Sequence, residues 1–170
     1  KAVKLPSIDD YKKTWKTIIR SSGIGSFIGV LPAEGGTVAS LIGYAEAKRW
    51  SKKPEDFGKG SIEGIAGAEA ANNAATGGAM VPTLALGIPG SATTAVILTG
   101  LIIHGVRPGP DLFREQPEFL YGIFGSMLIA NILFFVLGFF GAKIFARITL
   151  VPNKLLLSLI HISEPTRRHS

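Results

Sequence analysis

The chain has 170 residues, of which 46% are apolar, and it carries a formal net charge of +6 at pH 7. It contains no cysteine, which excludes a disulfide framework and a thiolate metal site. The basic residues flank apolar segments instead of forming one face. This distribution is typical of loops at a membrane surface and not of a nucleic-acid-binding surface. The charged residues gather in segments 1–20, 44–63, 107–118 and 143–154.

The first part of the chain contains a basic lead-in and an interrupted helix. Residues 1–16 are basic and partly amphipathic, and we expect a solvated or interfacial loop there. Residues 17–45 start helically, but the sequence GVLPAEGG (29–36) interrupts the pattern before it resumes. Residues 46–60 are charged and read as a loop.

The central part of the chain is apolar and contains a second interruption. Residues 61–79 are dense in Gly and Ala, which favours close helix packing. The next stretch, LALGIPGSATTAVILTG, contains Gly87, Pro89 and Gly90 within an otherwise apolar run. Unsatisfied backbone groups are not tolerated in lipid, so non-helical chain at membrane depth must face protein or a watery cavity. We therefore predict a broken helix at 86–94.

The longest uncharged segment lies near the C-terminus. Between Tyr121 and Ala142 there is no Asp, Glu, Lys or Arg. About 20 apolar residues suffice to cross the hydrocarbon core of a bilayer, and a buried core helix of that length rarely lacks a polar face. We expect a transmembrane helix over about residues 120–143. The preceding segment, 104–119, is rich in Pro and Gly and reads as a loop.

Together these elements predict an all-α fold, a polytopic membrane protein fragment with broken or re-entrant helices. Residues 1–160 form one partial membrane domain in this interpretation. Residues 151–160 read like the opening of another membrane helix. The sequence HISEPTRRHS (161–170) cannot continue that helix, and we interpret it as a non-native tail.

The two interruptions share one plan. GVLPAEGGTVASLI (29–42) and LGIPGSATTAVIL (86–98) each place Gly, Pro, small residues and a hydroxyl before a helix start. N–H groups at a helix start lack intrahelical partners and carry the positive end of the helix dipole, so they bind anions without a buried full charge. In the other interpretation, the Pro-Gly pair only kinks a helix that the hydroxyls cap. The predicted anion-binding residues are Gly35, Gly36 and Thr37 in the first interruption and Pro89, Gly90, Ser91, Thr93 and Thr94 in the second.

Polar residues between the interruptions are further candidates. Asn72 and Asn73 lie in a small-residue helix, where amides ligate Na⁺ or substrate, or else bond between helices. Glu69 shares a helix face with Asn72, and we assign ion coupling to Glu69 and Asn73. Glu63 lies nearer the charged loop, and we expect it at the membrane interface. A Na⁺ site is compatible with these residues, although its ligands are not defined by the sequence and no metal-binding motif is present.

The sequence from Tyr44 to Pro110 resembles the large permease subunit of tripartite tricarboxylate transporters. The resemblance spans about residues 18–155, and the FGKG, EAANNAATGG, P-T-x-x-L-G-I-P-G-S and HGVRPGP blocks occur in the family's order. One departure is Pro32-Ala33-Glu34-Gly35, where the family often has Pro-Gly-x-Gly. The resemblance implies secondary active uptake of a tricarboxylate or related carboxylate. It also implies coupling to Na⁺ or H⁺ with no other cofactor, a periplasmic solute-binding protein, a small membrane subunit and a bacterial inner-membrane location.

Charge bias predicts the orientation in the membrane. Segments 1–16, 46–60 and 143–154 carry an excess of Lys and Arg and are placed in the cytoplasm, with 105–119 outside. The first interrupted element is then a re-entrant hairpin. Residues 61–104 cross an odd number of times, with a re-entrant excursion around residues 80–90.

The sequence gives less support to other functional classes than to a transporter. An enzyme is not indicated, because the glycines of SGIGSFIGV do not follow G-x-G-x-x-G and no HExxH or Ser-His-Asp arrangement is present. An anion-conducting channel or a structural membrane subunit remains the alternative, since broken helices also line pores.

Overall fold

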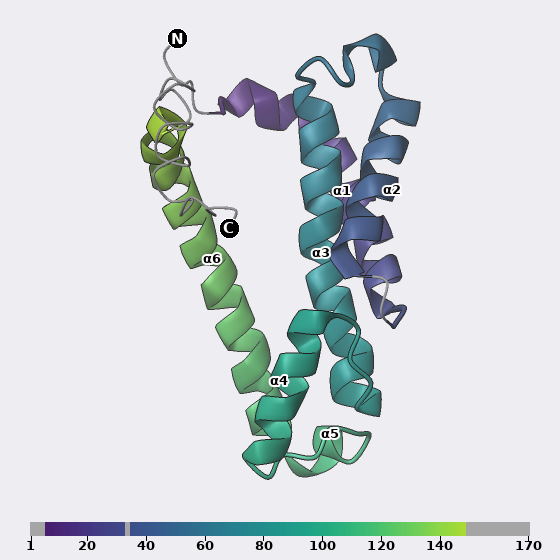
Figure 1. The fold of residues 1–170 in the computed structure, drawn as a ribbon, viewed down its shortest axis with the longest axis vertical. Coiled ribbons are helices and arrows are strands. Elements are labelled where there is room, and N and C mark those ends of the chain that lie inside the picture. The colour runs from purple at the N-terminus through teal and green to yellow at the C-terminus, as the bar shows by residue number, and fades with distance from the viewer. Residues whose placement is uncertain (1–5, 33–34, 149–170) are drawn as a thin grey trace, which may run out of the picture. The chain divides into compact units, whose positions relative to one another are not determined.

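The computed structural model describes residues 6–32 and 35–148. Within those residues the chain consists of helices, turns and loops without a strand, so the predicted all-helical fold is confirmed. Residues 1–5 of the predicted lead-in and the predicted tail at 161–170 lie outside the described residues. The chain divides into two compact units at Ile123 and Phe124. In the larger unit, three long helices, α1, α2 and α3, run side by side (Figure 1).

Helix α1 (Ile8–Val30) starts at a capping box. The Ser7 hydroxyl accepts a hydrogen bond from the Asp10 N–H at 3.3 Å, and the Asp10 carboxylate accepts one from the Ser7 N–H at 2.9 Å. This reciprocal pair satisfies two donors at the helix start. The bonds from the Ser7 backbone and then from its hydroxyl hold the pKa of Asp10 below its usual value. The prediction of a loop over 1–16 is therefore wrong from Ile8 onward, because the capping box starts the helix before the apolar pattern begins.

Helix α2 (Gly35–Trp50) packs on α1 and runs back along it (Figure 1). The charged segment expected as a loop from residue 46 is helical up to Trp50. A short 3-10 turn, η1 (Pro54–Asp56), and the capping residue Ser61 then lead into α3 (Ile62–Leu86).

Helices α1 and α3 pack in parallel with almost no side chain between them. The Thr17 hydroxyl donates to the Glu63 carboxylate at 2.8 Å. An added Cβ at Gly25 would overlap the backbone carbonyl oxygen of Ala71, and one at Gly29 would overlap that of Ala75. Small residues permit this close approach of helix backbones, which is how membrane helices associate without a hydrophobic driving force between them.

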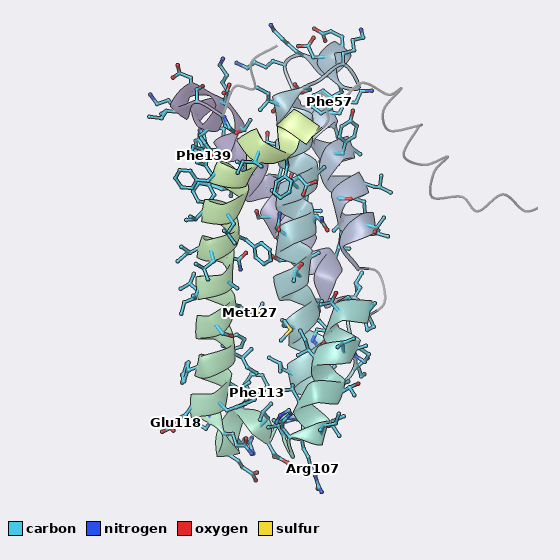
Figure 2. The ribbon with its side chains drawn as sticks, turned by 60° about the vertical axis from the view of Figure 1, so that its left-hand side comes forward. Phe57, Arg107, Phe113, Glu118, Met127 and Phe139 are labelled. Atoms are coloured by element: carbon cyan, nitrogen blue, oxygen red, sulfur yellow. The ribbon has the colours of Figure 1, made fainter. Side chains whose placement is uncertain are left out.

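Beyond α3 the chain folds into shorter elements at the far end of the unit. Helix α4 (Ala92–Ile103) follows the second interruption, and α5 (Leu112–Glu115) lies in the Pro/Gly loop. That loop is tied to α3 by a 2.9 Å hydrogen bond from the Gly109 N–H to the Leu84 carbonyl. Figure 2 shows Phe57, after α2, and Arg107, in the Pro/Gly loop, at opposite ends of the bundle.

Helix α6 (Pro117–Ile148) contains the predicted membrane span. Its segment Pro117–Ala142 is, by length and composition, the one helix within residues 6–32 and 35–148 that is long and apolar enough to cross a membrane. The Asn131 amide donates to the Met127 carbonyl of the same helix at 2.8 Å, which satisfies a polar group inside the apolar span.

Candidate functional site

The first interruption places the start of α2 directly against α3. Gly35 is the first helical residue and has a φ of +58°, which favours glycine. An added Cβ at Gly36 would overlap the Oδ1 of Asn72 and lie 3.2 Å from its Cγ. The Asn72 side chain therefore lies against the first turn of α2, and the structure brings together two residues that the sequence proposed separately.

Within the described residues, the first backbone N–H donors of α2 have no hydrogen-bond acceptor. In an α-helix the first N–H groups have no intrahelical acceptor, and here they belong to Gly35, Gly36 and Thr37. Thr37 is exposed. The Thr37 carbonyl accepts a 2.9 Å hydrogen bond from the Ser40 hydroxyl. This end of α2 thus presents positive dipole charge beside the Asn72 amide.

The second interruption runs back along α3 instead of continuing beyond it. Helix α3 ends at Leu86, and Gly87 ends it in the left-handed conformation with a φ of 67°. Gly90 then packs on Ala79, where an added Cβ would lie 2.8 Å from the Ala79 Cα. Ala79 precedes the helix end by about 10 Å of helical rise. The N-terminus of α4 therefore lies beside the body of α3 and not at its end (Figure 1).

A buried threonine, Thr83, which the sequence pattern does not mark, links the segment before α4 to α3 by hydrogen bonds. The Thr83 hydroxyl is fully buried, donates to the Ala79 carbonyl at 2.6 Å and accepts from the Gly90 N–H at 3.3 Å. It therefore fixes the loop just before α4 starts. Thr83 lies in the P-T-x-x-L-G-I-P-G-S block, but its role depends on a contact with Gly90 that no local pattern predicts.

The start of α4 is closed by a reciprocal pair of hydroxyls. The Ser91 hydroxyl accepts from the Thr94 N–H at 3.2 Å, and the Thr94 hydroxyl accepts from the Ser91 N–H at 2.8 Å. Thr94 is only 1% exposed. The donors of this turn that remain without an intrahelical acceptor are the N–H groups of Ala92 and Thr93. Thr93 is exposed, whereas Pro89 is half-buried in the loop.

Both interruptions meet one face of α3. Asn72, which lies against Gly36, and Ala79, which lies against Gly90, are two helical turns apart, so their side chains project from nearly the same side. Thr76 lies between them on this face and is exposed. The starts of α2 and α4 are thus about 10 Å apart along the axis of α3. Asn72 and Thr76 are the exposed polar side chains of α3 on this face.

On α3, Glu69 lies one turn before Asn72, and Asn73 is the residue after Asn72. Glu69 and Asn73 are both exposed, and the Asn73 amide nitrogen donates to the Glu69 backbone carbonyl at 2.9 Å. Among the described residues no side chain pairs with the Glu69 carboxylate. No group of three or more His, Cys, Asp or Glu side chains that could hold a metal ion occurs within the described part of the chain.

Glu63 occupies a different place from these residues. It is half-buried and accepts hydrogen bonds from the Thr17 hydroxyl at 2.8 Å and the Ser51 hydroxyl at 2.7 Å. It therefore ties α1 and the loop after α2 to the start of α3, at the end of the bundle that carries the charged loop.

Comparison with known proteins adds an independent line of evidence. The model of the Tripartite tricarboxylate transporter TctA family matches residues 1–163. The chain is 39% identical over 154 residues to an uncharacterized 52.8 kDa protein in the TAR-I ttuC' 3'region of Agrobacterium vitis, a match that covers 91% of this chain and 31% of that protein. It is 41% identical over 138 residues to an uncharacterized protein in the TAR-II ttuC' 3'region of the same organism, covering 81% of this chain and 57% of that protein. No solved structure matches the chain.

The chain spans about a third of the length of the first of these relatives. The family match covers both interrupted helices, the polar face of α3 and the apolar span of α6. The chain therefore belongs to the Tripartite tricarboxylate transporter TctA family, a family of membrane transporters.

Proposed function

We propose that this chain forms the part of a permease that binds a tricarboxylate or related carboxylate during uptake driven by an ion gradient. The observation that carries the proposal is the position of two helix starts, those of α2 and α4, beside one face of α3. Helix starts attract anions through unpaired N–H groups and the positive end of the helix dipole. They do so without a full positive charge, which is costly inside a bilayer.

The depth of these groups along α3 supports the proposal. Asn72 follows the first residue of α3, Ile62, by about 15 Å of helical rise. The hydrocarbon core of a bilayer is about 30 Å thick. If α3 enters the core near its first residue, Asn72 lies close to the midplane, where secondary transporters hold their substrates between broken helices.

The exposure of the site indicates where the rest of it is found. Thr37, Asn72, Thr76 and Thr93 are all exposed in this chain. Polar groups that face lipid are disfavoured at membrane depth. The chain covers 31% of the length of the first relative. We propose that the remaining part of the permease covers this face and supplies the opposite wall of the carboxylate site.

We propose that Glu69 and Asn73 couple uptake to the ion gradient. The Asn73 amide nitrogen donates to the Glu69 backbone carbonyl, and in this proposal the Asn73 amide oxygen ligates the cation. A carboxylate within a membrane segment either ligates Na⁺ or carries H⁺. Because these residues adjoin Asn72 on α3, ion binding and carboxylate binding act on the same helix.

The arrangement of the loops supports a multi-pass location in the bacterial inner membrane. The loop after α2 carries Lys52, Lys53 and Lys59 at one end of the bundle, and the Pro/Gly loop with Arg107 lies at the other (Figure 2). The positive-inside rule then assigns the first end to the cytoplasm and the second to the periplasm. There, we propose, a periplasmic solute-binding protein delivers the carboxylate, and a small membrane subunit completes the tripartite system named by the family.

Reconstitution tests this function directly. The intact permease, its small subunit and the binding protein are placed in proteoliposomes, and uptake of labelled citrate is measured under an imposed Na⁺ or H⁺ gradient. A carrier gives saturable uptake that needs the binding protein and collapses with an ionophore. Flux that persists without a gradient, at rates beyond an alternating cycle, identifies the anion channel instead.

A further inference from the structure

The charged end of the bundle contains a second feature, an open recess of about 1040 Å³. Its walls are the N-terminal half of α1, the end of α2, the following loop and the start of α3. Seven basic side chains line it against three acidic ones. The basic residues are Lys12, Lys13, Lys16, Arg20, Lys52, Lys53 and Lys59. The recess lies at the start of α3, so it is separate from the carboxylate site beside Asn72.

The positive charge of the recess is not neutralised within the described residues. Among the described residues, the ion pair with an N–O distance within 4.0 Å joins Arg49 to Glu46. Neither of these residues lines the recess. The acidic residue at its base, Glu63, already accepts hydrogen bonds from the hydroxyls of Thr17 and Ser51. The recess therefore presents a net positive field to a ligand.

Arg20 provides the most specific binding group. Its Nε and Nη2 atoms are buried and have no hydrogen-bond partner among the described residues. Its guanidinium carbon lies 5.4 Å from the centre of the Trp50 ring, which is a cation–π contact. Buried donors without acceptors are costly. The Nη1 nitrogen is not among these buried atoms, and a guanidinium charge in the wall of the recess attracts a phosphate.

The surroundings of the recess favour a ligand that also has an apolar part. Trp15 and Trp50 are 51% and 62% exposed. Exposed indoles are enriched at the headgroup level of membranes, where one side is apolar and the other wet. Ile19 and Ile62 are 64% and 54% exposed on the helices that form the walls. Acyl chains would cover such side chains, whereas a soluble anion would leave them in water.

We propose that this recess binds the headgroup of an anionic phospholipid, with Arg20 on the phosphate and the surrounding lysines as a positive rim. Juxtamembrane basic clusters attract anionic lipids in this way. The binding holds α1, the loop after α2 and the start of α3 together at one leaflet. The inference needs only the membrane location of the family and is independent of the proposed carboxylate site.

Native mass spectrometry of the intact permease tests the proposal. The protein is titrated with phosphatidylglycerol and with phosphatidylcholine of the same acyl chains. Phosphatidylglycerol binds more tightly, and Arg20→Gln weakens its binding about tenfold because it removes a charge-assisted phosphate contact. Arg49→Gln removes the same charge outside the recess and leaves binding unchanged. Equal binding of the two lipids, or an equal loss from both variants, overturns the proposal.

Two further measurements separate the remaining outcomes. If Arg20→Gln does not fold, the double variant Lys52→Gln/Lys53→Gln decides, because both side chains are exposed and their loss does not open a buried site. It is expected to weaken phosphatidylglycerol binding at least fivefold, and unchanged binding overturns the proposal. Inorganic phosphate serves as a competitor without an acyl chain. Displacement of the lipid by millimolar phosphate would assign the recess to a soluble anion and overturn the lipid assignment.

Discussion

Asn72 on α3 lies against Gly36 in the first turn of α2, and no β-carbon fits between them. This contact places a polar side chain from the middle of one helix beside the first turn of another, whose leading N–H groups have no acceptor within that helix. Seven residues further along α3, Ala79 makes an equally close contact with Gly90, just before α4 starts, through its backbone and β-carbon. These two close approaches place the starts of α2 and α4 beside α3, and the proposed site depends on that placement.

A methyl group at Gly36 tests the first contact. Gly36→Ala should displace the Asn72 side chain, so that its amide no longer reaches the bound carboxylate. A hydrogen bond to a charged group contributes about 1.5–3 kcal/mol, and citrate uptake at subsaturating substrate should therefore fall at least tenfold. Uptake by the reconstituted system measures the effect. Gly23→Ala is the matched control, since a Cβ there meets no atom within 4 Å. Normal uptake by Gly36→Ala would contradict the assignment.

Removal of the Thr83 hydroxyl tests the second contact. Thr83→Val keeps the shape of the side chain but removes the acceptor for the Gly90 N–H. One neutral hydrogen bond contributes about 1 kcal/mol, so KM for citrate should rise about fivefold. Thr99→Val is the control, because Thr99 is exposed and its hydroxyl donates to the Ala95 carbonyl of the same helix. Equal effects of the two variants would show that Thr83 does not position the site.

Thr93 and Thr94 should respond differently to the same substitution. Thr94→Val removes half of the reciprocal pair with Ser91 and should lower stability by about 1 kcal/mol, as loss of a helix cap does. Thr93→Val should leave the thermal unfolding of the purified permease unchanged but raise KM, because the Thr93 hydroxyl is exposed beside the free N–H groups. A loss of stability in Thr93→Val with a raised KM only in Thr94→Val would show instead that Thr93 caps the helix and Thr94 contacts the substrate.

The packing of α1 on α3 gives a prediction about stability alone. Gly25→Val should destabilise the protein by at least about 1–3 kcal/mol, since the added side chain meets the Ala71 backbone, which cannot move aside. Gly23 is two positions away, and a Cβ there would meet no atom within 4 Å, so Gly23→Val should leave the stability nearly unchanged. Thermal unfolding of both purified variants measures the difference. Similar midpoints for the two would mean that the helices do not approach this closely.

Neutralisation of Glu69 tests ion coupling. Glu69→Gln keeps the size of the side chain but removes the charge, so uptake should lose its dependence on the ion gradient while binding of citrate persists. Uptake is measured against Na⁺ concentration and against pH, and citrate binding to the solubilised permease is measured separately. Gradient-dependent uptake at the wild-type level would exclude Glu69 as the coupling residue.

Local sequence signals were sufficient for part of this fold. The uncharged run from Tyr121 to Ala142 marks α6, and the Pro and Gly residues near 32 and 89 mark the points where helices stop. The start of α1 does carry a local signal, since Ser7 and Asp10 have the spacing of a capping box, but the surrounding lysines favour a loop in the sequence pattern.

The geometry of the site could not be predicted in the same way. The return of the chain along α3 depends on Gly90 fitting against Ala79 and on the buried Thr83 hydroxyl, which are contacts between separate segments. The sequence also left open whether Ser91 and Thr94 cap a helix or bind substrate. Their reciprocal hydrogen bonds show that they cap α4, and the exposed Thr93 stays a candidate for substrate contact.

The most direct measurement is a cryo-electron microscopy map of the intact permease with citrate bound. It should show a carboxylate within hydrogen-bonding distance of the N–H groups at the start of α2, at Gly36, or of α4, at Thr93, with Asn72 beside it. Citrate bound away from both helix starts, or residues 86–94 forming one continuous helix that faces lipid, would contradict the proposed site.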